Sequence, residues 1–99
     1  MIFAARFMIT RKYIVHGRVQ GVGFRYFTWR MAEAFDITGR VCNASDGSVE
    51  IVASGTLENH RSFKEQIEIG PSGSRVDKIT LHEMQPERFD GFRVERGTP

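Results

Sequence analysis

The stretch GRVQGVGFR (residues 17–25) lies between a strand pattern and a helix pattern, and it sets how the fold begins. Over residues 12–20 the apolar side chains alternate, which is typical of a half-buried strand. Over residues 25–35 they recur at steps of three and four, which predicts a helix with an inner stripe of Phe24, Phe27, Met31, Ala34 and Phe35. Glycines separate the two patterns, so a strand, a loop and a helix are expected in that order.

Later segments have the composition of further strands: residues 40–44, 48–53 and 76–83, and a short final one over residues 91–94. The first two flank Asp46-Gly47. An Asp-Gly pair between two β-rich runs predicts a hairpin, because glycine tolerates the positive φ that such a turn needs.

A second helix is expected over residues 57–68, with Thr56 as its N-cap and an inner stripe of Leu57, His60, Phe63 and Ile67. The elements then follow the order β-α-β-β-α-β, with room for one extra terminal strand. This order predicts an α+β sandwich in which an antiparallel sheet carries two helices on one face.

The bulk composition predicts one globular domain. The chain has 99 residues, of which 40% are hydrophobic and 26% charged. We expect a domain over residues 11–96 behind a flexible tail over residues 1–10. Cys42 is the only cysteine, so no internal disulfide can form, which favours a reducing compartment such as the cytoplasm. No apolar run approaches the roughly 20 residues of a membrane span, and no long heptad pattern indicates self-association, so a monomer is expected.

The loop within residues 17–25 has the features of an anion-binding site. Gly21 and Gly23 allow successive backbone N–H groups to point into one concavity. The start of the following helix adds unpaired N–H groups, and Arg25 adds a planar fork of donors that matches phosphate oxygens. Together they predict a cup for a tetrahedral oxyanion that needs no metal ion. Nucleotide-binding glycine loops fit poorly, because position 26 is Tyr and no Gly-Lys-Ser/Thr follows.

The sequence also resembles a known family. Residues 19–25 (VQGVGFR) closely resemble the signature of acylphosphatases, and residues 39–43 (GRVCN) with 46–50 (DGSVE) resemble their second signature. Gly70-Pro71 and Arg75-Val76 are similar to the family's segment before the fourth strand. The resemblance covers about residues 11–96.

The resemblance implies a ferredoxin-like fold and the hydrolysis of acyl phosphates to a carboxylate and inorganic phosphate, with no cofactor. It implies that the phosphate is held by the loop residues Gln20, Gly21, Val22, Gly23, Phe24 and Arg25. By the same resemblance, Arg25 binds the phosphoryl oxygens and Asn43 orients the attacking water. One departure is visible, because Arg40 stands where the family usually has an aromatic residue.

The chemistry of the residues is consistent with this implication. A carboxylate is a good leaving group, so positioning and charge stabilisation can supply most of the acceleration. An asparagine such as Asn43 can hold water but is too weak to be a base, so we expect the substrate's own phosphate to take the proton. The three histidines lack metal-ligand spacing, and a catalytic role for Cys42 is disfavoured because alternation points its side chain away from that of Asn43.

Two other functions fit parts of the sequence. Residues 20–27 echo the glycine and aromatic spacing of an RNA-binding motif, and the pI is about 9.0. That motif requires a central strand, whereas these residues are expected at a helix start, so no nucleic-acid partner is predicted. The second is a binding domain that keeps the fold but has lost turnover, since acylphosphatase-like domains also begin large carbamoyl-transfer proteins. The sequence ends after one domain, which favours a freestanding enzyme, and the retained Arg25 and Asn43 argue against a loss of activity.

Charge is unevenly spread along the chain. Residues 1–43 carry seven basic side chains against two acidic ones, whereas residues 44–99 carry seven against ten. A positive first half suits an anionic ligand, although a solvated surface of mixed charge would give the same count.

Overall fold

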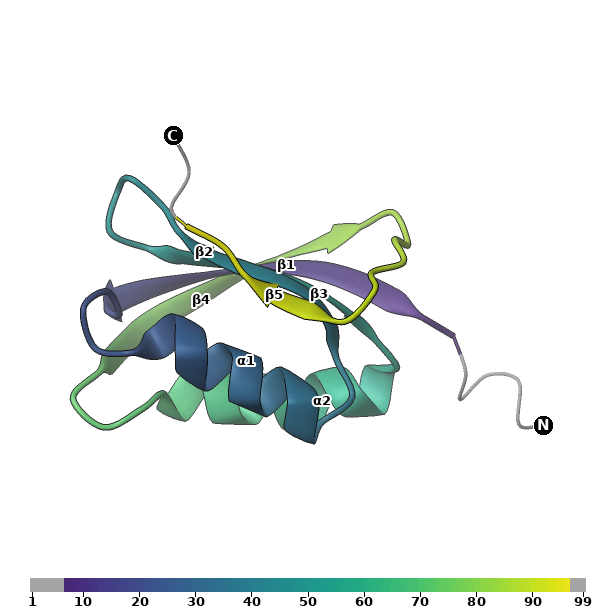
Figure 1. The fold of residues 1–99 in the computed structure, drawn as a ribbon, viewed down its shortest axis with the longest axis horizontal. Helices are drawn as coiled ribbons and strands as arrows, with labels where there is room; N and C mark the ends of the chain where they lie inside the picture. The colour runs from purple at the N-terminus through teal and green to yellow at the C-terminus, as the bar shows by residue number, and fades with distance from the viewer. Residues whose placement is uncertain (1–6, 97–99) are drawn as a thin grey trace.

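The computed structural model describes residues 7–96, which form one sheet with two helices packed against the same face of it (Figure 1). The elements follow the predicted order. They are β1 (Ile9–Arg18), α1 (Phe24–Ala34), β2 (Thr38–Asn43), β3 (Val49–Gly55), α2 (Leu57–Ile69), β4 (Arg75–Met84) and β5 (Phe92–Val94). The prediction of a ferredoxin-like α+β sandwich is confirmed.

The sheet has the strand order β4-β1-β3-β2-β5. The pairs β1–β3, β1–β4 and β2–β3 are antiparallel, but β5 lies parallel to β2. The sheet is therefore mixed, which corrects the expectation of a purely antiparallel one. The β2–β3 hairpin turns through Asp46-Gly47 as predicted, with Gly47 at a φ of 95°.

The first strand starts earlier than expected. β1 begins at Ile9, whereas the sequence predicts a strand from residue 12 and a domain from residue 11, so Ile9 and Thr10 lie in the sheet. Thr10 is buried, and its hydroxyl bonds to the Ser54 hydroxyl and accepts the Glu87 N–H. These long-range bonds fix the start of the strand and have no local signal in the sequence. The expected tail also covers residues 1–6, which lie outside the described residues.

The helices bury only part of the stripes that the sequence predicts. In α1, Phe27, Met31 and Phe35 are half-buried, and the buried Thr28 and Ala32 were not predicted. Buried residues are Phe24, Thr28 and Ala32 in α1, and His60, Phe63 and Ile67 in α2. Ala34 and Leu57 are exposed, although the sequence predicts both in the stripes. Each lies six positions from a fully buried residue, Thr28 or Phe63, and six residues turn a helix about 120° away from its starting direction.

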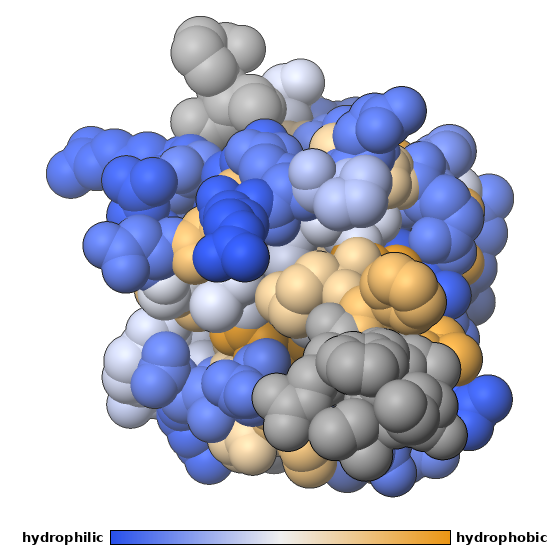
Figure 2. All heavy atoms as spheres, turned by 90° about the vertical axis from the view of Figure 1, so that its right-hand side faces the viewer, coloured by the Kyte–Doolittle hydropathy of each residue, from blue (hydrophilic) through white to orange (hydrophobic). Residues whose placement is uncertain are grey.

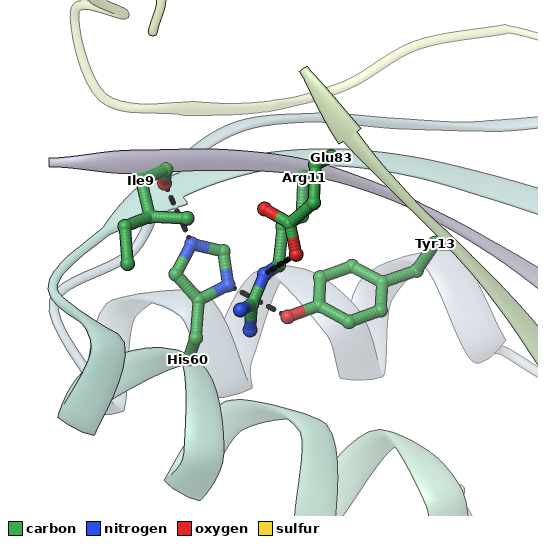
Figure 3. Close-up of polar contacts among 5 residues, drawn as sticks. All are labelled: Ile9, Arg11, Tyr13, His60 and Glu83. Atoms are coloured by element: carbon green, nitrogen blue, oxygen red, sulfur yellow. Dashed lines mark hydrogen bonds and ion pairs between the residues drawn. The ribbon is translucent and has the colours of Figure 1, made fainter. Parts of the chain in front are cut away.

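A polar pair ties α2 to β1 inside the core. The Tyr13 hydroxyl lies 2.6 Å from His60 Nδ1, and His60 Nε2 lies 2.7 Å from the Ile9 carbonyl oxygen (Figure 3). A neutral ring protonated at Nε2 satisfies both contacts, because it accepts from Tyr13 and donates to Ile9. Both side chains are fully buried. Burial lowers the pKa of His60 and raises the pKa of Tyr13 to about 12.

Neither α1 nor α2 is long and apolar enough to cross a membrane, and no other helix occurs between residues 7 and 96.

Candidate active site

The loop between β1 and α1 has the conformation that its glycines predict. Gly21 and Gly23 have φ angles of 76° and 77°, in the left-handed region that side chains with a Cβ rarely adopt. A Cβ added at either position would meet nothing within 4 Å. The backbone conformation, not a lack of space, therefore accounts for the glycines, and both remain exposed to solvent.

Gln20 braces this loop against the β2–β3 turn. Its Nε2 donates to the carbonyl oxygens of Ala44 and Ser48, at 2.8 and 2.9 Å. Figure 1 shows the β1–α1 loop and the β2–β3 turn at the same end of the molecule, far from the N-terminus. Because one amide group bonds to both sides of the turn, the loop and the hairpin are fixed relative to each other.

Helix α1 begins without a side-chain cap. Its N-cap residue is Gly23, which has no polar side chain, and within the described chain no other side chain caps the helix start. Its first turn contains no acidic residue. A helix start leaves several backbone N–H groups without intrahelical partners and carries a partial positive charge. These groups therefore stay available to an anion beside Gly21 and Gly23.

Arg25 is held by a segment that lies far along the chain. It is half-buried in the first turn of α1, and its Nη1 donates to the Glu95 carbonyl oxygen at 2.8 Å. Glu95 directly follows β5, and its N–H donates to the Val41 carbonyl oxygen at 2.8 Å. Within residues 7–96 the guanidinium makes no ion pair. The guanidinium is thus oriented by a neutral carbonyl, and no carboxylate of the described residues compensates its positive charge.

Asn43 ends β2 on the helix-covered side of the sheet. It lies two residues after the buried Val41, so both side chains point to the same face. The turn that follows is rigid, because Asp46 Oδ1 accepts from the Ser48 N–H and hydroxyl at 2.9 and 2.6 Å. These bonds hold the pKa of the Asp46 carboxyl below its usual range.

The loop, α1 and β2 meet around a hollow of about 220 Å³. Its lining residues are Val19, Gly21, Gly23, Phe24, Arg25, Tyr26, Asn43 and Val94. Five of the seven predicted site residues thus share one hollow. Gln20 and Val22 do not line it, and Gln20 instead bonds the loop to the β2–β3 turn. Tyr26 and Val94 line the hollow without having been predicted, since an exposed helix residue and a terminal strand give no signal of a site.

Comparison with known proteins identifies the family. A model of the acylphosphatase family matches residues 11–94, which is most of the chain. The chain belongs to the acylphosphatase family. Acylphosphatases are hydrolases, and the family implies a small-molecule acyl phosphate as substrate.

Individual acylphosphatases match over nearly their whole length. The acylphosphatase of Mannheimia succiniciproducens is 44% identical over 89 residues, which cover 89% of this chain and 99% of that protein. The crystal structure of the Bacillus subtilis acylphosphatase is 39% identical, with a TM-score of 0.85 over 88% of this chain and 98% of that one. Full-length HypF in its phosphate- and nucleotide-bound form is 28% identical, with a TM-score of 0.86, but only 12% of that chain is covered.

The acylphosphatase chain has a larger hollow of about 470 Å³ elsewhere, lined by Met8, Thr38, Arg88, Phe89 and Asp90. Figure 2 shows this opposite end of the molecule, where apolar side chains gather in an exposed patch. The lining of this larger hollow includes none of the predicted site residues, no residue of the glycine loop and no residue of a helix start. The smaller hollow therefore remains the candidate site, because it combines a cation with free N–H donors.

The residue that departs from the acylphosphatase pattern does not line the candidate site. Arg40 lies with Cys42 around a hollow of about 170 Å³ that excludes Asn43, as strand alternation predicts. Its guanidinium lies 5.6 Å from the centre of the Phe89 ring, and its Nε lies 4.0 Å from Glu95 Oε1. Burial raises the pKa of the Cys42 thiol, with the carboxylates of Glu50 and Glu95 adding to the effect, so this cysteine lacks the lowered pKa of a reactive thiol.

The described part of the acylphosphatase structure contains neither a cluster of metal ligands nor the exposed strand aromatics of an RNA-binding sheet. Between residues 7 and 96, no group of three or more His, Cys, Asp or Glu side chains could hold a metal ion. His60 is packed in the core as expected, and His82 is exposed on β4. Phe24 is buried in the first turn of α1, whereas an RNA-binding sheet requires aromatic side chains exposed on a central strand.

Proposed function

We propose that this acylphosphatase hydrolyses acyl phosphates without a metal ion, with the loop over residues 20–25 and Arg25 binding the phosphoryl group. The support is the hollow in which Gly21, Gly23, Arg25 and Asn43 meet. Backbone N–H groups at the start of α1 and the Arg25 guanidinium both stabilise negative charge on phosphoryl oxygens. This juxtaposition is the observation that carries the proposal.

Asn43 orients the attacking water on the opposite side of the phosphorus from the acyl oxygen. The water oxygen forms a bond to phosphorus while the bond from phosphorus to the acyl oxygen breaks. The carboxylate leaves with the electron pair, and a phosphoryl oxygen of the substrate takes the water's proton. The products are a carboxylate and inorganic phosphate. Because carboxylates leave readily, this route needs no protein acid or base.

Rigid support of Arg25 and Asn43 makes this mechanism efficient. Misplacement of a reacting group by 1 Å can cost on the order of 10²-fold in rate. The Glu95 carbonyl orients Arg25, Gln20 fixes the loop against the hairpin, and the Asp46–Ser48 bonds fix the turn beyond Asn43. The donors are therefore preorganised before the substrate arrives, as charge stabilisation of a transition state requires.

The test is the loss of benzoyl phosphate, followed by ultraviolet absorbance with EDTA present. The unsubstituted protein is compared with Arg25→Gln and Asn43→Ala. Loss of one preorganised contact lowers turnover on the order of 10²–10³-fold. Matched controls are Arg61→Gln and Asn59→Ala on α2, which lie away from the hollow and retain full activity. Circular dichroism checks that each variant is folded.

Three results would overturn the proposal. A folded, unsubstituted protein that leaves benzoyl phosphate intact would exclude the activity. Activity that EDTA abolishes would exclude the metal-free route. Activity that survives Arg25→Gln would mean that the phosphoryl group binds elsewhere on the same fold.

The rate should also be nearly independent of pH around neutrality, because the substrate itself takes the proton. A pH profile of kcat that rises and falls with the titration of one of the three histidines would contradict this step. Substitution of each histidine by Gln identifies which residue governs such a profile.

We also propose that the protein works as a monomer in the cytoplasm and takes no nucleic-acid partner. The support is a single, buried cysteine, which suits a reducing compartment, and a sequence without a long heptad pattern. Light scattering after size exclusion tests the monomer, and a doubled mass at micromolar concentration would refute it. Binding of single-stranded RNA in competition with phosphate would refute the absence of a nucleic-acid partner.

A further inference from the structure

Two apolar side chains flank the polar centre of the candidate site. Tyr26 comes from the first turn of α1 and Val94 from the end of β5, and both line the hollow beside Arg25. Tyr26 is 62% exposed and Val94 is 45% exposed. Apolar surface at the rim of a polar hollow marks a place where a ligand can bury an apolar part of itself.

The Tyr26 ring is held in place before any ligand binds. It stacks on Trp29, with ring centres 5.8 Å apart and an angle of 20° between the rings. The Arg30 guanidinium lies 6.0 Å from the Tyr26 ring centre. A ring already fixed by its neighbours loses little conformational freedom on binding, so a contact with it adds more to affinity. Tyr26 is thus a preformed platform.

The chemistry of an acyl phosphate matches this arrangement of polar centre and apolar rim. The phosphoryl group carries all the negative charge, and the proposed function assigns it to the loop and Arg25. The acyl group is attached through a single oxygen, so it extends a few ångströms from the phosphorus. From the centre of a hollow of about 220 Å³, it therefore reaches side chains at the rim.

We propose that Tyr26 and Val94 form a subsite for the acyl group, and that it favours acyl phosphates with an aromatic or branched aliphatic group over acetyl phosphate. This inference rests on the proposed function, because it assigns the other end of the same substrate. A phenyl ring has more apolar surface than a methyl group, so it can bury more of that surface against the Tyr26 ring and Val94.

The first test is the ratio of kcat/KM for benzoyl phosphate to kcat/KM for acetyl phosphate. One aromatic contact changes affinity by about 2- to 10-fold, so Tyr26→Ala should lower this ratio about 2- to 10-fold. Tyr26→Phe retains the ring and should keep the ratio, and Val94→Ser should lower it by a smaller factor. Leu57→Ala is the matched control, because Leu57 is an exposed apolar residue on α2, outside the hollow.

A second measurement does not depend on turnover. Trp29 is the only tryptophan in the chain and lies against Tyr26, so its fluorescence reports on this subsite. Titration with phenylphosphonate and methylphosphonate compares an aromatic and a methyl group on the same anionic head. The unsubstituted protein should bind phenylphosphonate about 2- to 10-fold more tightly, and Tyr26→Ala should remove this difference.

The outcomes separate the subsite from the proposed function. Hydrolysis of both substrates with a ratio that Tyr26→Ala leaves unchanged, and equal binding of both phosphonates, would overturn the subsite while the hydrolysis stands. A folded protein that hydrolyses neither substrate would overturn the proposed function. In that case a preference for phenylphosphonate that depends on Tyr26 would still support the apolar subsite, and equal binding of the two probes would overturn it.

Discussion

The two helices begin in opposite ways. Helix α2 has Thr56 as its N-cap, whose side chain accepts the Asn59 N–H at 3.1 Å, and Glu58 adds a negative charge in the first turn. Helix α1 starts after Gly23, with no cap from any described side chain and no acid in its first turn, and it carries Arg25 there instead. Negative charge at a helix start is favourable and positive charge is not. The start of α1 thus lacks the local stabilisation that α2 has.

The difference shows what each helix start does. A side-chain cap contributes about 1 kcal/mol to stability by occupying backbone N–H groups. At α2 a side chain occupies one of these groups, whereas at α1 no described side chain does, and the adjacent Arg25 guanidinium has no ion-pair partner between residues 7 and 96. A bound phosphoryl group would supply the missing negative charge at α1. The contrast between the two helix starts therefore supports the proposal that the start of α1 binds the phosphoryl group.

A negative side chain placed in the cup should have the largest effect. Gly23→Asp adds a carboxylate where the phosphoryl group is proposed to bind, and Gly23→Asn adds a neutral group of the same size. Both residues tolerate positive φ better than others do, and a Cβ meets nothing within 4 Å. Like charges about 4 Å apart repel by about 4 kcal/mol at a protein surface, so kcat/KM for benzoyl phosphate should fall about 10³-fold further for Asp than for Asn. Equal losses in the two variants would refute charge as the cause.

The anchor of α2 should matter for stability rather than activity. His60→Leu leaves the Tyr13 hydroxyl and the Ile9 carbonyl without their buried partner, and each unpaired group costs about 1–3 kcal/mol. The free energy of unfolding should fall by about 2–6 kcal/mol, as measured by urea denaturation. His82→Leu on the exposed face of β4 is the control and should change it by less than about 0.5 kcal/mol. A small loss for His60→Leu would mean that the polar pair does not hold α2.

The same histidine should make stability depend on pH. Burial lowers the pKa of His60 in the folded state below the ordinary 6.5, so below pH 6.5 the unfolded state binds more protons than the folded state. The contribution of the neutral His60 ring to the free energy of unfolding is fully present above pH 6.5. It is lost as pH falls toward the lowered pKa, by at most about 1.4 kcal/mol per pH unit. Urea titrations from about pH 7.5 to 5 should show a loss that is smaller in His60→Gln. An equal loss in that variant would assign the effect to other groups.

Removal of the α2 cap should give the smallest effect. Thr56→Ala should cost about 1 kcal/mol of stability, which lowers Tm by about 4–8 °C in a domain of this size. Thr56→Ser keeps the hydroxyl and should retain most of the Tm. Benzoyl phosphate hydrolysis should remain unchanged in both variants, because α2 does not line the hollow. A loss of turnover after Thr56→Ala in folded protein would contradict the separation of the two helix starts.

The parts of the site that the sequence predicted are local. The glycine loop, Arg25 at a helix start, and Asn43 before an Asp-Gly turn all follow from neighbouring residues. The parts it missed depend on pairing between distant segments. The Glu95 carbonyl reaches Arg25 only because β5 lies parallel to β2, and the sequence shows the strand but not its partner. The early start of β1 at Ile9 likewise depends on bonds to segments more than 40 residues away.

The errors in the helix stripes have a different cause. Residues spaced by three and four positions follow the buried face of a helix only on average. Consecutive three-residue steps move the side chains away from that face. In α2, Leu57 lies two three-residue steps before Phe63 and falls outside the buried face. In α1, the predicted stripe passes through the half-buried Met31, and one more three-residue step reaches the exposed Ala34.

Tyr26 could not be recognised as a site residue from its neighbours in the sequence. An exposed aromatic residue beside a buried stripe has the pattern of ordinary helix surface. Only the fold brings Val94, from the last strand, to the same hollow. The apolar rim of the site therefore depends on tertiary structure, whereas its polar centre follows from local sequence.

The most direct measurement is a titration of ¹⁵N-labelled protein with inorganic phosphate, followed through the backbone amide resonances. If the uncapped start of α1 binds the phosphoryl group, the amides of residues 21–25 should show the largest saturable shifts. The amides of residues 57–60 at the capped start of α2 should stay unchanged. Arg25→Gln should weaken the binding. Shifts of equal size at both helix starts, or none at residues 21–25, would contradict the account.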